Sequence, residues 1–256
     1  MKAGLNLYSI RNLIQTEEDF LQTALKLKEM GYSFMQYSGA PFDAEKIKRV
    51  SEKSGLPVVL THVPYDRIVN DTEKLMEEHA VFGCKNIGLG MMPIDKLIDE
   101  KLCKEAVAKL NEAGKKMAEK GFKFFYHHHH YEFIKHSGQT VFDYMVENAP
   151  YINFIIDTYW LQFAGRDILA TLDKLKGRYS CVHLKDYMIH INANKNNSIE
   201  PTFAPVGEGE IDFKAVTAKM KECGVEYYLV EQDNAALMED GLAQVEKSIK
   251  YIQKEL

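Results

Sequence analysis

Short apolar or β-branched runs alternate with amphipathic stretches eight times along the chain. The apolar runs predict strands near residues 3–8, 33–37, 57–62, 85–89, 122–128, 152–157, 179–184 and 226–231. The stretches between them have helical spacing; one helix is expected from Thr16 to Gly31, a residue type that suits a helix end. The alternation predicts parallel βα units.

Eight such units in 256 residues favour a closed (β/α)8 TIM barrel over an open doubly wound sheet, because closure uses every strand. We therefore expect a single α/β domain over residues 1–256. One segment, from Tyr187 to Ile211, is too long and polar for an ordinary connection. Because it follows the seventh strand, we expect it to lie over the active face.

Composition narrows the class of protein. The net charge of −5, from 32 basic and 37 acidic residues, argues against a broad nucleic-acid-binding surface. The N-terminus lacks a signal-peptide pattern and no run of 18 apolar residues is free of charge, so we expect a soluble, cytoplasmic protein without a membrane partner. The cysteines are far apart without CxxC spacing, which predicts buried free thiols at Cys84, Cys103, Cys181 and Cys223.

Three apolar runs end in an acidic or imidazole residue, namely Asp157, His183 and Glu231. In a (β/α)8 barrel the catalytic groups lie at the carboxyl ends of the strands, where these residues fall. Any one of the acidic residues there can simply cap the next helix. Together, beside a strand rich in histidine, they favour a site for a borderline divalent metal.

The strand rich in histidine is FYHHHHYEF, residues 125 to 133. Strand alternation places His127 and His129 on one face and His128 and His130 on the other, and only one face lines the barrel interior. The other pair is expected to pack beneath helices. Glu132, just past the strand, has three interpretations: a general base, a group that orients a ligating histidine, or a solvated loop charge.

The strings FYHHHHYEF, IDTYWLQFAGRD, VHLKD, PVGEGEIDF and LVEQD occur in this order. They resemble the xylose isomerase-like TIM barrel superfamily, specifically the sugar phosphate isomerase/epimerase group (AP endonuclease family 2), which includes endonuclease IV. The resemblance spans the whole chain and is most specific in its second half. It implies a divalent metal held by one residue from each of the last four strands, which by motif are His127, Asp157, His183 and Glu231.

One ligand position departs from the family pattern. Epimerases of the superfamily commonly carry glutamate on strand five and use it with the strand-eight glutamate as two bases, whereas this chain has His127. The resemblance is closer to the group whose strand five reads YHNH, which includes inosose dehydratase-like and 3-keto-glycoside-processing enzymes. Mixed carboxylate and imidazole ligands favour manganese, with zinc, cobalt and magnesium also compatible.

The resemblance implies an enediolate mechanism on a small sugar. Glu231 is then a ligand that also relays the proton, and the other acid–base candidates are Glu132, His129 and Lys185. Lys185 lies two residues past His183 and points the same way; the alternative is a surface lysine. Residues predicted to contact sugar, each with a structural role as the alternative, are His62, Gln36 and Trp160.

The sequence does not decide between two outcomes for the enediolate. Reprotonation elsewhere gives isomerisation or epimerisation, whereas loss of a β-substituent gives dehydration or glycoside lysis. No glycine-rich phosphate loop is evident, which favours an unphosphorylated sugar or keto-sugar. The alternative of another class is an endonuclease IV-like nuclease, but that enzyme has histidine where this chain has Trp160. A non-catalytic sugar-binding barrel or partner-dependent subunit is a further alternative, and a homo-oligomer is compatible with the sequence.

Overall fold

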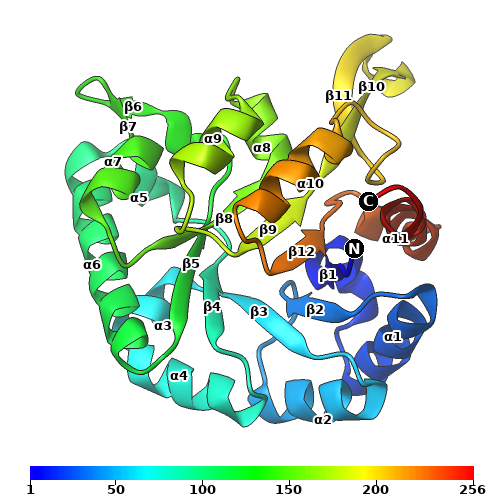
Figure 1. Cartoon of the computed structure of the whole chain (residues 1–256), viewed down its shortest axis with the longest axis horizontal. Helices are drawn as coiled ribbons and strands as arrows, with labels where there is room; N and C mark the ends of the chain where they lie inside the picture. Colours follow the sequence, from blue (N-terminus) through cyan, green and yellow to red (C-terminus); the bar gives the residue numbers. More distant parts are fainter.

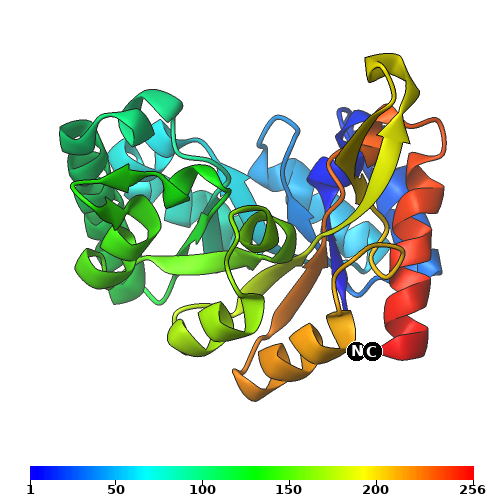
Figure 2. The ribbon, with the colours of Figure 1, turned by 90° about the horizontal axis from the view of Figure 1, so that it is seen from above.

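The computed structural model describes all 256 residues and contains a closed barrel of eight parallel strands (Figure 1). Around the barrel the order is β1-β12-β9-β8-β5-β4-β3-β2. All eight predicted strands are confirmed: β1 (Gly4–Asn6), β2 (Phe34–Tyr37), β3 (Val58–Val63), β4 (Asn86–Leu89), β5 (Lys123–His127), β8 (Asn153–Asp157), β9 (Cys181–Leu184) and β12 (Tyr227–Val230). Because β1 pairs with β12, the two chain ends lie close together (Figure 2).

Helices cover the outside of the barrel (Figure 1). They are α1 (Glu17–Met30), α2 (Ala44–Ser54), α3 (Tyr65–Asn70), α4 (Thr72–Val81), α5 (Ile94–Ile98), α6 (Glu100–Glu119), α7 (Val141–Asn148), α8 (Thr158–Phe163), α9 (Ile168–Lys174), α10 (Phe213–Glu222) and α11 (Gly241–Glu255). The predicted ends of α1 are confirmed. The Thr16 side chain accepts the backbone N–H of Asp19, and Gly31 ends the helix in the left-handed conformation at φ +100°.

The barrel interior is built in layers, and this layering positions the site. Its apolar layer consists of Phe34, Leu60, Phe125, Ile155, Cys181 and Leu229. Side chains two residues apart on a strand share a face, so the next layer toward the carboxyl ends holds Gln36, His62, His127, Asp157, His183 and Glu231. The strand register keeps this layer level, for example by pairing Asp157 with His183. A polar layer of side chains, the polar ring, therefore lies directly above the apolar layer of the barrel interior, the apolar plug.

The segment after β9 differs from its expected form. It is an antiparallel hairpin of β10 (Asp186–Asn192) and β11 (Ser198–Ala204), with a short 3-10 turn, η3 (Ala193–Lys195), between the strands. The hairpin root packs on α8, but its tip stands away from the barrel, and the segment does not lie across the mouth as a loop (Figure 1). The buried carboxylate of Asp186 fixes the return segment by accepting the backbone N–H groups of Gly207, Gly209 and Ile211.

The remaining elements are small. They are a two-stranded ribbon, β6 (Lys135–His136) and β7 (Gln139–Thr140), and the 3-10 helices η1 (Leu7–Leu13), η2 (Tyr131–Phe133) and η4 (Ala235–Leu237). The four cysteines are free and buried, as predicted. None of the helices combines the length and the apolar character that crossing a bilayer requires.

Candidate metal centre

Four side chains from neighbouring strands meet at the barrel mouth: His127 of β5, Asp157 of β8, His183 of β9 and Glu231 just past β12. One ligand atom of each lies within 4.8 Å of the others, and all four side chains are buried. Nδ1 of His183 is 2.7 Å from Oε2 of Glu231, and Nε2 of His127 is 3.3 Å from Oδ2 of Asp157. The residues predicted as metal ligands thus form one cluster.

Hydrogen bonds on the outer side of the cluster fix both imidazoles. Nδ1 of His127 lies 3.0 Å from the carbonyl oxygen of Gly90, which can only accept, so this nitrogen carries the proton. Nε2 of His183 donates to Oε1 of Gln36 at 2.8 Å. Each ring therefore presents its other nitrogen to the centre as a lone pair, which is how histidine ligands are oriented in metal sites.

This arrangement fits a divalent cation. Nδ1 of His183 lies only 2.7 Å from the buried Oε2 of Glu231, so a proton or a metal ion has to lie between these two acceptor atoms. Lys185 is the ammonium group beside three carboxylates, those of Asp157, Glu231 and Asp233, so with a neutral His183 two negative charges are left over. A divalent metal would satisfy the lone pairs and the charge together.

The titration behaviour of the cluster has the same origin. Burial would raise the pKa of Glu231, but the positive charges of Lys185 and His183 hold that pKa well below its usual value. Burial is likewise outweighed at Asp157, where Lys185 lowers the pKa. Burial opposes a charge on His183, yet Glu231 and Asp157 raise its pKa to about 9. The carboxylates that attract this proton are the groups that would attract a metal ion.

Lys185 is a fixed positive charge at the mouth. Its Nζ donates to Oδ2 of Asp233 at 2.9 Å and lies 3.6 Å from Oε2 of Glu231 and 3.8 Å from Oδ2 of Asp157. Although burial opposes the charge, these carboxylates raise the pKa of Lys185. The alternative of a surface lysine is wrong, since only 1% of the residue is exposed.

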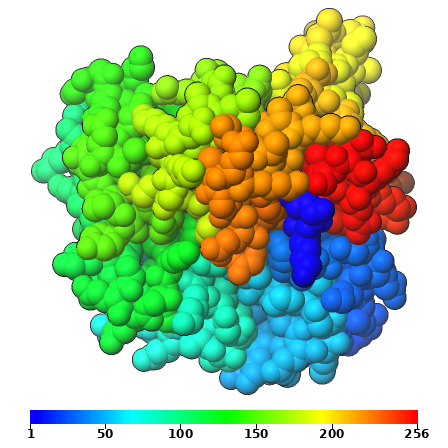
Figure 3. Space-filling view, viewed as in Figure 1, coloured from blue at the N-terminus to red at the C-terminus, as the bar shows by residue number.

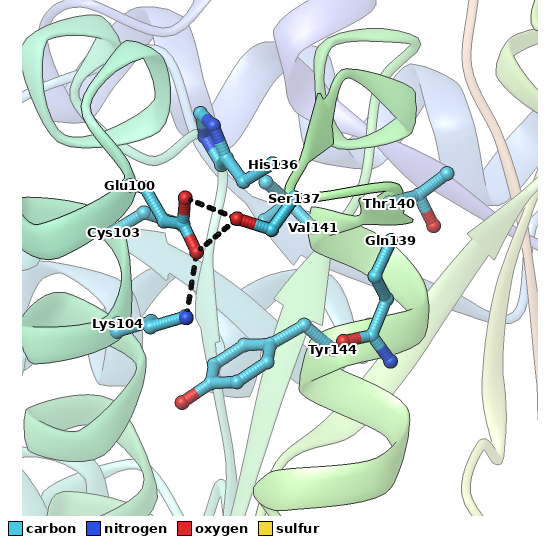
Figure 4. A pocket seen from close by; sticks show the side chains of 9 residues that line it. All are labelled: Glu100, Cys103, Lys104, His136, Ser137, Gln139, Thr140, Val141 and Tyr144. Carbon is cyan, nitrogen blue, oxygen red and sulfur yellow. Dashed lines mark hydrogen bonds and ion pairs between the residues drawn. The ribbon is translucent and has the colours of Figure 1, made fainter.

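The cluster opens into a cavity of about 390 Å³. His62, His127, His129, Lys185 and Glu231 are among the residues that line it. A second cavity, of about 70 Å³, lies between α6 and the β6–β7 ribbon (Figure 4). There Ser137 and Lys104 both donate to the carboxylate of Glu100, so its polar groups satisfy one another. Of these two cavities, the one at the mouth combines open space with buried polar atoms that lack a hydrogen-bond partner, among them Oε2 of Glu231 and Nδ1 of His129.

The other histidines of the run fall in two places. His128 points outward, accepts the backbone N–H of Asp157 at 3.2 Å and packs against Phe142 of α7; burial lowers its pKa to about 3. It is the satisfied, non-lining imidazole that was predicted. His130 instead lies in the loop beyond β5, against Trp160, and is only partly buried.

Glu132 does not reach the cavity. It is fully buried, and its two oxygens accept the hydroxyl of Tyr126 at 2.8 Å and the backbone N–H of His129 at 2.7 Å. The interpretation as a solvated loop charge is therefore wrong. The carboxylate holds the end of β5 in place, and so supports the backbone of His129 where that residue enters the cavity wall.

The residues predicted to contact sugar are also divided. His62 lines the cavity. Gln36 is buried behind it, where its amide Nε2 donates to Nε2 of His62 at 2.8 Å, so the structure places Gln36 as an orienting residue rather than in the cavity wall. The ring of Trp160 lies 5.2 Å from that of His129 and 5.1 Å from Nζ of Lys185, against two lining residues.

Asp157 serves two purposes. Its Oδ1 accepts the backbone N–H of Trp160 at 3.0 Å and so caps α8, while Oδ2 faces the metal cluster. The capping interpretation and the ligand interpretation of this residue therefore describe different oxygens of one carboxylate.

Three contacts in the site were not predicted. The amide of Asn6 donates to Oε1 of Glu231 at 2.9 Å and its oxygen accepts the hydroxyl of Ser38, and Asp233 binds Lys185. Asp233 follows Glu231 by two residues, so the same spacing that identified Lys185 also identifies it. The contact of Asn6 has no such signal, because it depends on the register of β1 against β12.

Comparison with known families agrees with this geometry. Residues 24–255 match the xylose isomerase-like TIM barrel family. The chain belongs to that family. Its members include sugar isomerases, epimerases and dehydratases, which are enzymes. The predicted family and fold are thereby confirmed.

Individual relatives are more distant. An inosose dehydratase of Geobacillus thermodenitrificans (strain NG80-2) is 31% identical over 156 residues, which are 57% of this chain and 52% of that protein. The chain thus matches about half the length of that relative. A sugar phosphate isomerase/epimerase structure from Parabacteroides distasonis ATCC 8503 covers 99% of this chain and 94% of its own, with a TM-score of 0.80 and 21% identity.

A second structure is a xylose isomerase-like TIM barrel protein from Mycobacterium smegmatis in complex with magnesium. It has a TM-score of 0.70 and 14% identity, and the match covers 98% of this chain and 94% of that one. At these identities both structures establish the fold alone.

Proposed function

We propose that the protein is a divalent-metal-dependent sugar isomerase or epimerase that abstracts a proton next to a carbonyl of a monosaccharide or keto-sugar. The observation that carries the proposal is the cluster of two carboxylates and two imidazoles beside a cavity of about 390 Å³, which His127 and Glu231 of this cluster line. Cavities of roughly 300–1,000 Å³ bind small molecules. The metal, when bound, acts as a Lewis acid that acidifies the carbon next to a carbonyl.

The chain supplies groups to move the proton. His129 lines the cavity, and its buried Nδ1 has no hydrogen-bond partner. Burial, together with His127 and Lys185, lowers the pKa of His129, so its ring is neutral and offers a lone pair through which it would relay a substrate proton. Glu231 is the second proton-transfer group at the cavity wall, and Asn6 donates to its Oε1. The two groups come from β5 and β12, which are three strands apart in the barrel.

Two further residues act on substrate oxygens. Lys185 carries a fixed positive charge in the cavity wall and would stabilise the oxygen of an enediolate. Because Gln36 donates to Nε2 of His62, the ring proton of His62 sits on Nδ1. That Nδ1 lies beside Gly90, which also lines the cavity, and there it would donate to a sugar hydroxyl.

Dehydration is the second candidate. It begins with the same proton abstraction, after which a β-substituent leaves, as in glycoside lysis of a 3-keto-sugar. The 31% identity with an inosose dehydratase favours it. His127 occupies the strand-five ligand position, so a symmetric reaction with two glutamate bases is not part of the proposal.

Proton exchange in deuterated water tests the proposal. Protein loaded with Mn²⁺, and in parallel with Mg²⁺, Zn²⁺ or Co²⁺, is incubated with ketoses, aldoses and 3-keto-glycosides, and deuterium incorporation is followed by NMR. We expect metal-dependent exchange that is lost in His183→Ala, because that variant lacks one of the four ligands. The product distinguishes isomerase, epimerase and lyase.

A matched variant separates loss of chemistry from loss of metal. Lys185→Met keeps all four ligands and removes the charge that faces the substrate, so we expect metal binding without efficient exchange. Protein that holds metal by elemental analysis, yet exchanges no proton of any sugar in the panel, would contradict the proposal.

A further inference from the structure

The β10–β11 hairpin has one fully apolar face. Cross-strand partners are Tyr187 with Phe203, Ile189 with Pro201 and Ile191 with Ile199. Because residues of an antiparallel pair share a face, these six side chains lie together, and the opposite face carries Met188, His190, Asn192, Ser198, Glu200 and Thr202. A face of this kind normally rests on a core.

Only the root of this apolar face is covered. Tyr187 and Phe203 pack on the ring of Tyr159, at 5.4 and 4.9 Å between centroids. Toward the tip, Ile189 is 52% exposed, Ile191 66% and Ile199 74%. In the space-filling view the hairpin protrudes from the body of the molecule (Figure 3). A two-stranded ribbon is marginally stable by itself, so this face calls for a partner.

The two edges of the hairpin differ in what can pair with them. The hairpin is a separate two-stranded sheet, so no further strand pairs with either outer edge. From Tyr187 to Asn192, β10 contains no acidic residue, lysine, arginine or proline, which are the residues that protect edges from pairing. β11 contains Glu200 and Pro201, one a charge and the other lacking an N–H donor. The open edge is therefore β10.

We propose that this edge pairs with the same edge of a second copy of the chain, antiparallel about a two-fold axis, to give a four-stranded sheet in the order β11-β10-β10-β11. In a two-fold contact a strand pairs with its own copy, so like charges on that strand would repel each other. From Tyr187 to Asn192, β10 carries no such charge, whereas pairing through β11 would bring the two copies of Glu200 together. The paired sheet would bring the exposed isoleucines of both copies onto one continuous face.

The size of the surface fits a second copy rather than a small ligand. The open edge of β10 runs over six residues, 187–192, which is about 20 Å of strand and matches a second strand of the same length. The contact does not depend on the proposed reaction.

Sedimentation of the full chain with two matched variants tests the pairing. Ile191→Lys places like charges near the axis on β10, whereas Ile199→Lys changes its cross-strand partner on β11, an equally exposed position one strand farther away. We expect twice the chain mass for the wild type and for Ile199→Lys, and the mass of one chain for Ile191→Lys. A monomeric wild type, or equal effects of the two variants, would overturn the proposal.

Cysteine cross-linking gives an independent readout. The residue on the two-fold axis lies opposite itself at about 4.5–5.5 Å, within disulfide reach, whereas β11 would be three strand spacings, about 14 Å, from its copy. Oxidised His190→Cys or Ile191→Cys should therefore yield a covalent dimer and Ile199→Cys should not, with the native cysteines buried. Absence of cross-linking at both β10 positions, or efficient cross-linking at position 199, would overturn β10 pairing.

Discussion

The two halves of the barrel mouth contain residues of similar polarity but use them differently. On β5, β8, β9 and β12, the ring that rests on the apolar plug presents carboxylates and imidazole lone pairs to one point. On β1, β2 and β4, Asn6, Gln36 and the carbonyl of Gly90 face the same point. None of these is a charged ligand. Each instead binds one ligand from the other half, Glu231, His183 and His127 respectively.

This division shows how the barrel makes a site from eight short strands. The second half supplies ligand atoms, and the first half fixes which lone pair of each ligand faces inward. Asp157 is the exception, because it is oriented within its own half by capping α8. We therefore expect changes in the second half to abolish metal binding and changes in the first half to weaken it.

The largest effect is expected for Asp157→Asn. Asparagine caps a helix about as well as aspartate, so α8 remains capped while the cluster loses one of its two ligating carboxylates. We expect no measurable Mn²⁺ binding by titration calorimetry, together with loss of proton exchange.

The matched control for this variant is Asp167→Asn. Asp167 caps α9 by accepting the backbone N–H of Ala170 at 2.8 Å and takes no part in the cluster. This variant should bind metal like the wild type. If Asp157→Asn also did so, the cluster would not be the metal site.

An intermediate effect is expected for Gln36→Leu, a change in the first half. Leucine fills the buried space but leaves Nε2 of His183 without its acceptor. Loss of such an outer partner typically weakens metal affinity about 10–100-fold, or roughly 1.4–2.8 kcal/mol. Competition with a metal-sensitive chelator measures the change.

Asn86→Leu is the control for this second variant. The Asn86 amide donates to the carbonyl of Val59 at the opposite end of the barrel, so its loss should lower stability without changing the affinity for metal. Equal loss of affinity in both variants would show that Gln36 acts through stability alone.

The sequence predicted the barrel because strand and helix periods are local properties of the chain. It also predicted Asp157, His183 and Glu231, since each directly ends an apolar run. The choice of His127 over His128 required knowing that Phe125 belongs to the interior layer. Periodicity gives two faces of a strand without saying which one is inside.

The orienting contacts lay beyond prediction for a different reason. Gln36 meets His183, and Asn6 meets Glu231, only because barrel closure and strand register bring together segments more than 140 residues apart. The hairpin is a third case. Its strands alternate apolar and polar residues, but the polar run NANKNNS between them favoured a long polar connection over a hairpin.

The smallest effect on the site is expected from His79, an imidazole buried in the first half with neutral partners. Its Nδ1 donates to the carbonyl of Leu75 and its Nε2 faces the hydroxyl of Thr61, each at 2.7 Å, and burial lowers its pKa to about 4. His183, surrounded by carboxylates, shows the opposite shift. Between pH 6.5 and 4 the unfolded chain takes up a proton at His79 that the folded chain does not, so stability falls as the pH falls.

His79→Gln should therefore leave metal affinity at pH 7 unchanged and should remove about 2 kcal/mol of the stability that metal-free wild type loses between pH 7 and pH 5. Urea unfolding at the two pH values measures the difference. Other buried histidines titrate in both proteins and cancel in the comparison. An unchanged pH dependence in the variant would mean that His79 is protonated in the folded state. The contrast between His79, with neutral partners, and His183, among carboxylates, would then be wrong.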